Sequence, residues 1–320
     1  MGLRWPRHRV HAKPVSPMVS QVPDFKGWFP EIEGFPRPDG KAIAEWIRQN
    51  VSSDRPEVAW QGIIREWLQR MRERLGKAYV VTESQHFHVL SELDAKKQKE
   101  LLSFLEQTRA RIVRQLGDIS LAERPGKHVI MRFSDEDDYY RYTSYFDEEG
   151  EYAGSGGRFH GGDCAHIAFP HSDVIGADHS ILIHELTHDL LESFPHPAWL
   201  GEALAMAFQG DGAQTGGPLV TRELADEHRA YWNPQTIQEF WQGISFGDVE
   251  GQKLAYNLAS ILLNLIATEL RPPPAQFRDF VLHADRKDAG QSAALEHLDV
   301  DLSDLVATFL GPGEWAPQLS

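Results

Sequence analysis

The spacing of apolar residues predicts a helix between residues 54 and 76. Apolar side chains recur there at intervals of three and four positions, as on one face of a helix that ends at Gly76. The members of this stripe are Trp60, Ile63, Ile64, Trp67, Leu68, Met71 and Leu75. Ahead of it, residues 21–40 mix prolines with aromatic side chains, which is typical of an ordered segment wrapped over a core. We expect residues 1–76 to be a largely helical N-terminal extension.

The next part of the chain alternates between short apolar runs and helical patterns. Four runs have the length of buried strands, at residues 78–82, 86–90, 128–133 and 165–169. A long helical pattern separates the second run from the third and ends at Gly117. This alternation predicts a mixed sheet with helices packed against it.

Every element predicted after residue 180 is a helix. The expected helices cover residues 181–191, 198–208, 224–232, 236–241, 251–270, 277–283, 293–298 and 302–309. The predicted fold class is therefore α+β, with a small N-terminal mixed sheet and its helices followed by a helical C-terminal half.

The first of these helices contains the sequence His184-Glu185-Leu186-Thr187-His188. Residues four apart lie one above the other on a helix, so His184 and His188 can direct two imidazoles at one point. Prolines at positions 195 and 197 end the helix, and the chain reversal brings Glu202 of the next helix back towards the histidines. Two imidazoles and one carboxylate leave the fourth position of a tetrahedral Zn²⁺ open for water, which is the arrangement of a catalytic site.

This motif, followed by Trp199-Leu200-Gly201-Glu202-Ala203, resembles the gluzincin metallopeptidases. The short spacer is most similar to that of compact bacterial peptidase-MA-like domains. The resemblance implies a zinc domain over residues 77–315, with the zinc in the cleft between the sheet and the helical half. It also implies that Cys164 to Phe169 is the sheet edge that pairs with extended substrate. Met206 stands where thermolysin-like enzymes carry an aspartate that orients a ligand histidine, so that partner must come from elsewhere.

Each site residue has an expected role. Zinc held by His184, His188 and Glu202 would bring the pKa of its water towards neutrality. Glu185 would take the proton of that water as general base and pass it to the leaving amine. The resemblance implies a further donor to the oxyanion, for which we select Tyr256 within Tyr256-Asn257-Leu258-Ala259.

Alternative roles stay open for several residues. Tyr256 can instead be a core tyrosine with a backbone partner, and the other candidate oxyanion donors are His228 and Tyr231. Asp189 either holds the outer nitrogen of a ligand histidine or is an ordinary exposed acid. Cys164 is either a buried inert thiol or a thiolate that occupies the zinc. A loose cluster upstream forms a second metal site or is solvated, and its members are His160, Asp163, His166 and His171.

Composition narrows the choice of partners. The formal net charge of −15 argues against nucleic acid and anionic membranes, both of which require positive patches. No apolar run is long enough to span a bilayer, and no apolar stretch follows the basic residues near the start as in a secretory signal. The single cysteine excludes an intramolecular disulfide and suits a reducing compartment, so a cytoplasmic protein is expected. The oligomeric state is left open.

These patterns together predict a zinc-dependent peptidase that hydrolyses a peptide or protein substrate. Two alternatives remain: a peptidase-like domain that binds zinc without turnover, and a zinc hydrolase of a non-peptide amide or ester. No motif identifies a clamp for an amino or carboxyl terminus, so endopeptidase action is favoured only by default.

Overall fold

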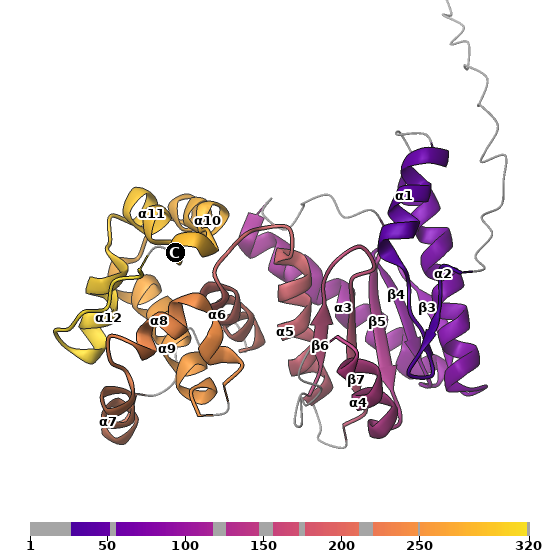
Figure 1. The fold of residues 1–320 in the computed structure, drawn as a ribbon, viewed down its shortest axis with the longest axis horizontal. Helices are drawn as coiled ribbons and strands as arrows, with labels where there is room; N and C mark the ends of the chain where they lie inside the picture. Colours follow the sequence, from indigo (N-terminus) through magenta and orange to yellow (C-terminus); the bar gives the residue numbers. More distant parts are fainter. Residues whose placement is uncertain are drawn as a thin grey trace, which may run out of the picture.

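The computed structural model describes residues 27–51, 56–117, 126–146, 156–172, 177–210, 220–248 and 250–318. A five-stranded sheet with its helices forms one side of the molecule, and the later helices form the other (Figure 1). The predicted class, a small mixed sheet followed by many helices, is confirmed.

The sheet contains three central parallel strands with an antiparallel strand at each end. Its strands are β3 (Val80–Glu83), β4 (Phe87–Ser91), β5 (His128–Phe133), β6 (Arg158–His160) and β7 (His166–Pro170). Their order is β3-β4-β5-β7-β6, with β4, β5 and β7 parallel to one another. β4, β7 and all but the first residue of β5 are buried, as expected for parallel strands that helices cover on both faces.

One prediction about the sheet is wrong. Cys164 to Phe169 was expected to form the edge, but β7 lies between β5 and β6, and β6 is the edge strand on that side of the sheet. β6 is only three residues long and follows a glycine-rich segment. Such a short strand has no hydrophobic period from which the sequence could predict it.

Helices cover the two faces of the sheet in pairs. α3 (Ala95–Leu116) and α5 (Ala177–Leu191) cover one face, whereas α2 (Pro56–Leu75) and α4 (Glu136–Ser144) cover the other. Alternate residues of β5 point to opposite faces: Ile130 belongs to the core beneath α3 and α5, and Val129 and Met131 to the core beneath α2 and α4. Both cores are apolar, so the sheet is held from both sides.

The described residues before position 76 pack onto the face of the sheet that α2 covers. They form a hairpin of β1 (Glu31–Ile32) and β2 (Phe35–Pro36), then α1 (Gly40–Asn50) and α2. Glu33 and Gly34 both have positive φ, as in the tight turns that match strand twist. The helix predicted to end at Gly76 is confirmed as α2, whose apolar stripe shares a core with the sheet. The domain boundary near residue 76 stays a prediction.

The second half of the described chain is helical, as predicted. Its α-helices are α6 (Ala198–Gln209), α7 (Arg222–Tyr231), α8 (Thr236–Gln242), α9 (Gln252–Leu265), α10 (Pro274–His283), α11 (Gln291–Ala293) and α12 (Leu302–Leu310). Short 3-10 or π turns lie at Ile244–Phe246, Ile266–Leu270, Arg286–Asp288 and Ala294–Leu298. α6 packs against α5, α8 and α9 and so joins the sheet side to the later helices. None of the helices in the described ranges has the length and apolar character needed to cross a bilayer.

Truncating the core between α3 and the sheet should cost far more stability than truncating a surface leucine. Leu105 of α3 is fully buried, and Leu105→Ala is expected to lower the free energy of unfolding by about 2–5 kcal/mol. The matched control is Leu295→Ala, because Leu295 is 49% exposed and its loss should change stability by only about 0.5 kcal/mol. Urea unfolding curves measure both values. Equal losses would contradict the packing of α3 on the sheet.

Candidate metal centre

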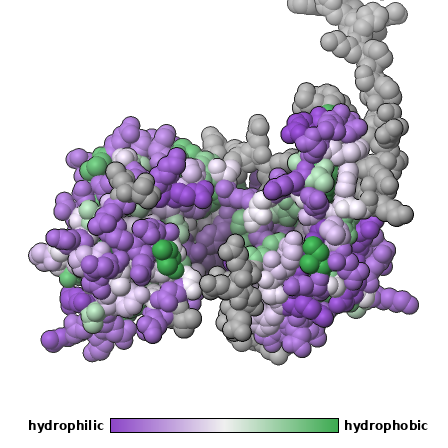
Figure 2. All heavy atoms as spheres, viewed as in Figure 1, coloured by the Kyte–Doolittle hydropathy of each residue, from purple (hydrophilic) through white to green (hydrophobic). Residues whose placement is uncertain are grey.

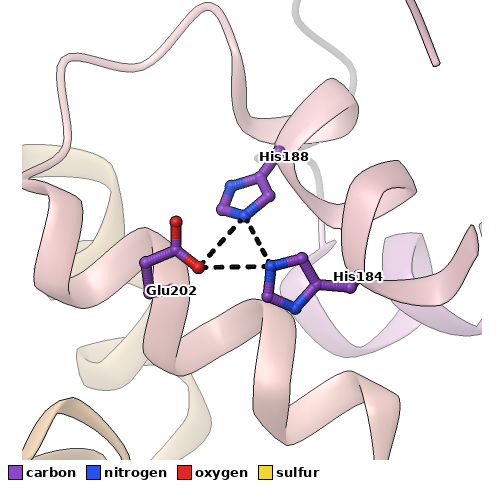
Figure 3. A group of neighbouring side chains, drawn as sticks. All are labelled: His184, His188 and Glu202. Atoms are coloured by element: carbon purple, nitrogen blue, oxygen red, sulfur yellow. Dashed lines mark hydrogen bonds and ion pairs between the residues drawn. The ribbon is translucent and has the colours of Figure 1, made fainter. Parts of the chain in front are cut away.

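Two consecutive helices bring three donor groups together. α5 carries His184 and His188 one turn apart, and α6 begins at Ala198 after the proline-containing turn. Pro197 has φ −68° and ψ 150°, extended angles that turn the chain so that α6 packs along α5. Glu202, in the second turn of α6, therefore faces both histidines (Figure 3).

The three donor atoms form a nearly equilateral triangle. The Nε2 atoms of His184 and His188 are 3.1 Å apart, and they lie 3.2 and 3.4 Å, respectively, from Oε2 of Glu202 (Figure 3). Three ligands of a tetrahedral metal ion lie about 3.3 Å from one another when each is bound at the usual distance. The triangle therefore has the dimensions of three corners of a tetrahedral site, with the fourth corner left for another ligand.

The chemistry of the donors also fits a metal ion. Oε2 of Glu202 is buried and has no hydrogen-bond partner of suitable geometry, so a bound cation would supply what this oxygen lacks. Two imidazole nitrogens and a carboxylate oxygen are a common donor set for a divalent transition metal. Within the described part of the chain, this is the one group of such side chains close enough to share an ion.

The electrostatics of the group keep Glu202 ionised. Burial raises the pKa of the Glu202 carboxyl, but His184 and His188 beside it outweigh burial and lower the pKa to about 2. For His188, burial lowers the pKa, whereas Glu202 and Glu185 raise it and determine the net direction. The site is thus a concentration of negative charge that either protons or a cation must balance.

Glu185 lies between the triangle and the sheet, and it is electrostatically coupled to the triangle residues and hydrogen-bonded to β6. Its Oε2 accepts a hydrogen bond of 2.7 Å from the backbone N–H of Phe159 in β6. Burial raises the pKa of the Glu185 carboxyl, although His188 and His184 act in the opposite direction. A carboxylate fixed beside a metal group, with a raised pKa, is suited to accept and return a proton.

Tyr256 of α9 lies beside the two carboxylates. Burial, the negative charges of Glu202 and Glu185 and a hydrogen bond to Glu202 all raise the pKa of its phenol. Its ring packs edge-on against Phe246, with centroids 5.3 Å apart. The structure therefore brings Tyr256 to the group, although its role in catalysis stays a prediction.

The two other candidate oxyanion donors have other neighbours. His228 is fully buried, where its Nδ1 accepts a hydrogen bond of 2.9 Å from Trp232 and its ring packs on Phe309. The Tyr231 hydroxyl lies beside Asp248 and Gly251.

His196 is a neighbour of the site that the sequence analysis missed. It stands between the two prolines of the turn, and its ring occupies the space above Gly201, where an added Cβ would be 2.6 Å from Nε2. Burial, and then the charge of His188, lower the pKa of His196 to about 4, so its ring is neutral at pH 7. Gly201 is required because any side chain there would displace His196. The sequence did contain a signal for this neighbour, because His196 is a histidine in the short segment between His188 and Glu202.

Asp189 is not an exposed acid, which was one of the two roles predicted for it, and the orientation of a ligand histidine stays a prediction. It is buried, and its Oδ2 lies 2.6 Å from Nδ1 of His128 at the start of β5. This contact attaches α5 to the sheet one residue beyond His188. The partner is 61 positions away in the chain, which is why the sequence did not reveal it.

The predicted cluster upstream does not form a second metal site. The buried rings of His160 and His166 are 4.9 Å apart and pack with Tyr142, whereas His171 contacts Arg132 and Asp163 contacts Gly40. No metal-binding group of these residues occurs in the described ranges.

Cys164 packs against the core on the face of the sheet opposite α5. Burial, followed by the nearby carboxylates of Asp163 and Asp39, raises the pKa of this thiol to about 12. This agrees with the inert-thiol prediction.

No protein-family model, curated protein or solved structure matches this chain. Its function therefore has to be inferred from the geometry of the site.

Removing the carboxylate from the triangle should weaken metal binding. We expect the wild type to bind one zinc ion per chain, and Glu202→Gln to bind it at least about tenfold more weakly because a charged ligand is lost. Glu106→Gln is the matched control, since Glu106 also contacts a histidine, His86, at 2.7 Å but lies outside the triangle. Competition with a chromogenic chelator measures the affinities. Equal affinity in the wild type and Glu202→Gln would contradict the assignment.

Proposed function

We propose that this protein is a zinc-dependent peptidase in which His184, His188 and Glu202 hold the metal and Glu185 is the general base. The observation that carries the proposal is the triangle of donor atoms, with edges of 3.1–3.4 Å, next to a buried glutamate that does not belong to it. A structural metal site needs no such second carboxylate. A hydrolytic site does, because a proton must leave the attacking water.

Zinc is proposed because of the donor set and the number of ligands. Two histidines and one glutamate on two helices supply three protein ligands, as in catalytic zinc sites. Structural zinc sites usually have four protein ligands. When bound, zinc would lower the pKa of a water molecule and polarise the carbonyl of a substrate.

Glu185 is positioned by the sheet. Its Oε2 accepts the Phe159 N–H, which fixes the plane of the carboxylate and leaves Oε1 to exchange a proton with water and with the leaving amine. The raised pKa makes this carboxylate a better proton acceptor than an ordinary glutamate, as the role of general base requires. Phe159 therefore acts as a positioning residue through its backbone.

The proposed position of the substrate is between the sheet and the later helices. Figure 2 shows a hollow between these two parts of the surface. The resemblance to gluzincins assigns the main chain of the substrate to the outermost strand beside the metal helix, which is β6 in the described part of the chain. The Tyr256 phenol approaches from α9, where it can donate to the oxyanion that forms when the carbonyl is attacked.

The base is tested with Glu185→Gln. This variant keeps the three metal ligands, so it should bind zinc like the wild type, while peptide cleavage falls about 100-fold or more because no carboxylate accepts the proton. A mixed peptide library analysed by mass spectrometry, with metal content measured in parallel, provides the readout. If both proteins bind zinc and neither cleaves a peptide, the protein is a zinc-binding domain or a hydrolase of another amide or ester. Equal cleavage by both would exclude Glu185 as the base.

The oxyanion donor is tested with Tyr256→Phe. Loss of the hydroxyl should lower kcat about 100-fold and change zinc affinity little, since the phenol is not a ligand. Tyr231→Phe is the control, because this hydroxyl lies beside Asp248 instead. A normal kcat in Tyr256→Phe would show that Tyr256 is only a packing residue.

A further inference from the structure

A second pocket lies on the face of the sheet opposite α5. It has a volume of about 460 Å³, within the range of small-molecule sites, and lies between the N-terminal segment and the α4–β7 region. The residues that line it include Arg37, Asp39, Tyr145, Phe146, Cys164 and His166. None of these residues belongs to the metal centre.

Arg37 is a buried cation with unused donors. Only 2% of its surface is exposed, and although Nη2 donates to the Tyr142 carbonyl oxygen at 2.8 Å, Nε and Nη1 have no acceptor. Its Cζ lies 4.1 Å from the ring centroid of Tyr142 and 4.5 Å from that of Tyr145. The Glu33 carboxylate also acts on this guanidinium, but no oxygen accepts a hydrogen bond from Nε or Nη1, so burial of these two donors is costly. The two unmatched N–H groups are donors that a ligand could use.

His166, the other buried polar side chain that lines the pocket, already has a hydrogen-bond partner for each ring nitrogen. The Tyr142 hydroxyl lies 2.7 Å from Nε2 of His166, and the Cys164 carbonyl oxygen lies 2.9 Å from Nδ1. These contacts fit one neutral tautomer, in which Nδ1–H donates to the carbonyl and Nε2 accepts from the hydroxyl. Among these lining groups, the unmatched N–H groups therefore belong to Arg37.

The charges around the pocket disfavour a ligand that carries more than one negative charge, since the carboxylate of Glu33 also acts on Arg37. Lys41 adds a second cation at the exposed rim, whereas Asp39 and Asp163 contribute two carboxylates. Asp39 is also occupied as the cap of α1, accepting from the Ala42 N–H at 3.0 Å. A doubly charged phosphate would be repelled by the two acids, but a monocarboxylate can approach Arg37.

The wall of the pocket is aromatic and partly exposed. Tyr145 and Phe146 are 43% and 38% exposed, unusually high for large aromatic side chains. The inner face of Phe146 stacks on the buried ring of His160, with centroids 4.0 Å apart, so the ring is supported from behind. Its position suits contact with an apolar or planar ligand group.

We propose that this pocket binds a small monocarboxylate with an apolar, planar part. The carboxylate pairs with Arg37, and the apolar part lies against Phe146 and Tyr145. Because the Tyr145 ring lies over the guanidinium, this exposed ring turns aside when the ligand enters. The site is separate from the metal centre, and its occupancy does not depend on peptidase activity.

The test measures binding of phenylacetate, acetate and inorganic phosphate to the full chain by calorimetry. Phenylacetate should bind the wild type more tightly than the other two, and Arg37→Gln should weaken it at least about tenfold. Arg141→Gln is the matched control: its guanidinium lies over the Phe35 ring, as that of Arg37 does, but outside the pocket, so binding should not change.

Tyr145→Ala provides a second test if Arg37→Gln does not fold. Tyr145 is 43% exposed, so its removal should lower the thermal transition only slightly while weakening phenylacetate several-fold more than acetate. The proposal is overturned if phenylacetate does not bind, if phosphate binds most tightly, or if neither variant changes binding. Loss of binding in Glu202→Gln, with none in Arg37→Gln or Tyr145→Ala, would place the ligand at the metal centre and equally overturn it.

Discussion

Packing between α5 and α6 is the contact on which the candidate metal centre depends. Leu182, Leu186 and Leu190 of α5 and Trp199 and Leu200 of α6 are all buried in one core. The Trp199 indole donates a hydrogen bond of 2.9 Å to the Ala289 carbonyl oxygen, which anchors α6 to the later helices. Burial of this apolar surface offsets the cost of desolvating two histidines and a glutamate at the same interface.

α5 uses two adjacent faces for two purposes. His184 and His188 are four residues apart and point to α6, whereas Glu185 and Asp189, also four apart, point to the sheet. Glu185 contacts β6 and Asp189 contacts β5, so two side-chain contacts, one turn apart on α5, attach the helix to the sheet. A rotation of α5 about its axis would break both contacts and misplace both ligand histidines. The sheet thus sets the orientation of the metal-binding face without contributing a ligand.

Sequence patterns predicted what depends on local spacing. The i, i+4 histidines, the proline turn and Glu202 lie close together in the chain, and the strands β4, β5 and β7 are apolar runs that stand out from their surroundings. The missed features depend on contacts between distant segments: the order of β6 and β7, the His128–Asp189 pair, and the packing of His196 over Gly201. Hydrophobic periodicity cannot reveal such contacts, because each contact involves a single residue from each of the two distant segments. The burial of Arg37 could not be predicted for the same reason, since a single arginine in a proline-rich segment gives no sign that it packs against distant residues.

The distances along the chain have a consequence for the order of assembly. All three metal donors lie between residues 184 and 202, in one helical hairpin, whereas the partner of Glu185 lies 26 positions earlier and that of Asp189 lies 61 positions earlier. Local contacts form before distant ones during folding. A metal ion can therefore be captured by the hairpin, and can help α6 dock on α5, before the sheet has positioned Glu185. If the proposed function holds, a refolding chain would hold the metal before its general base is in place.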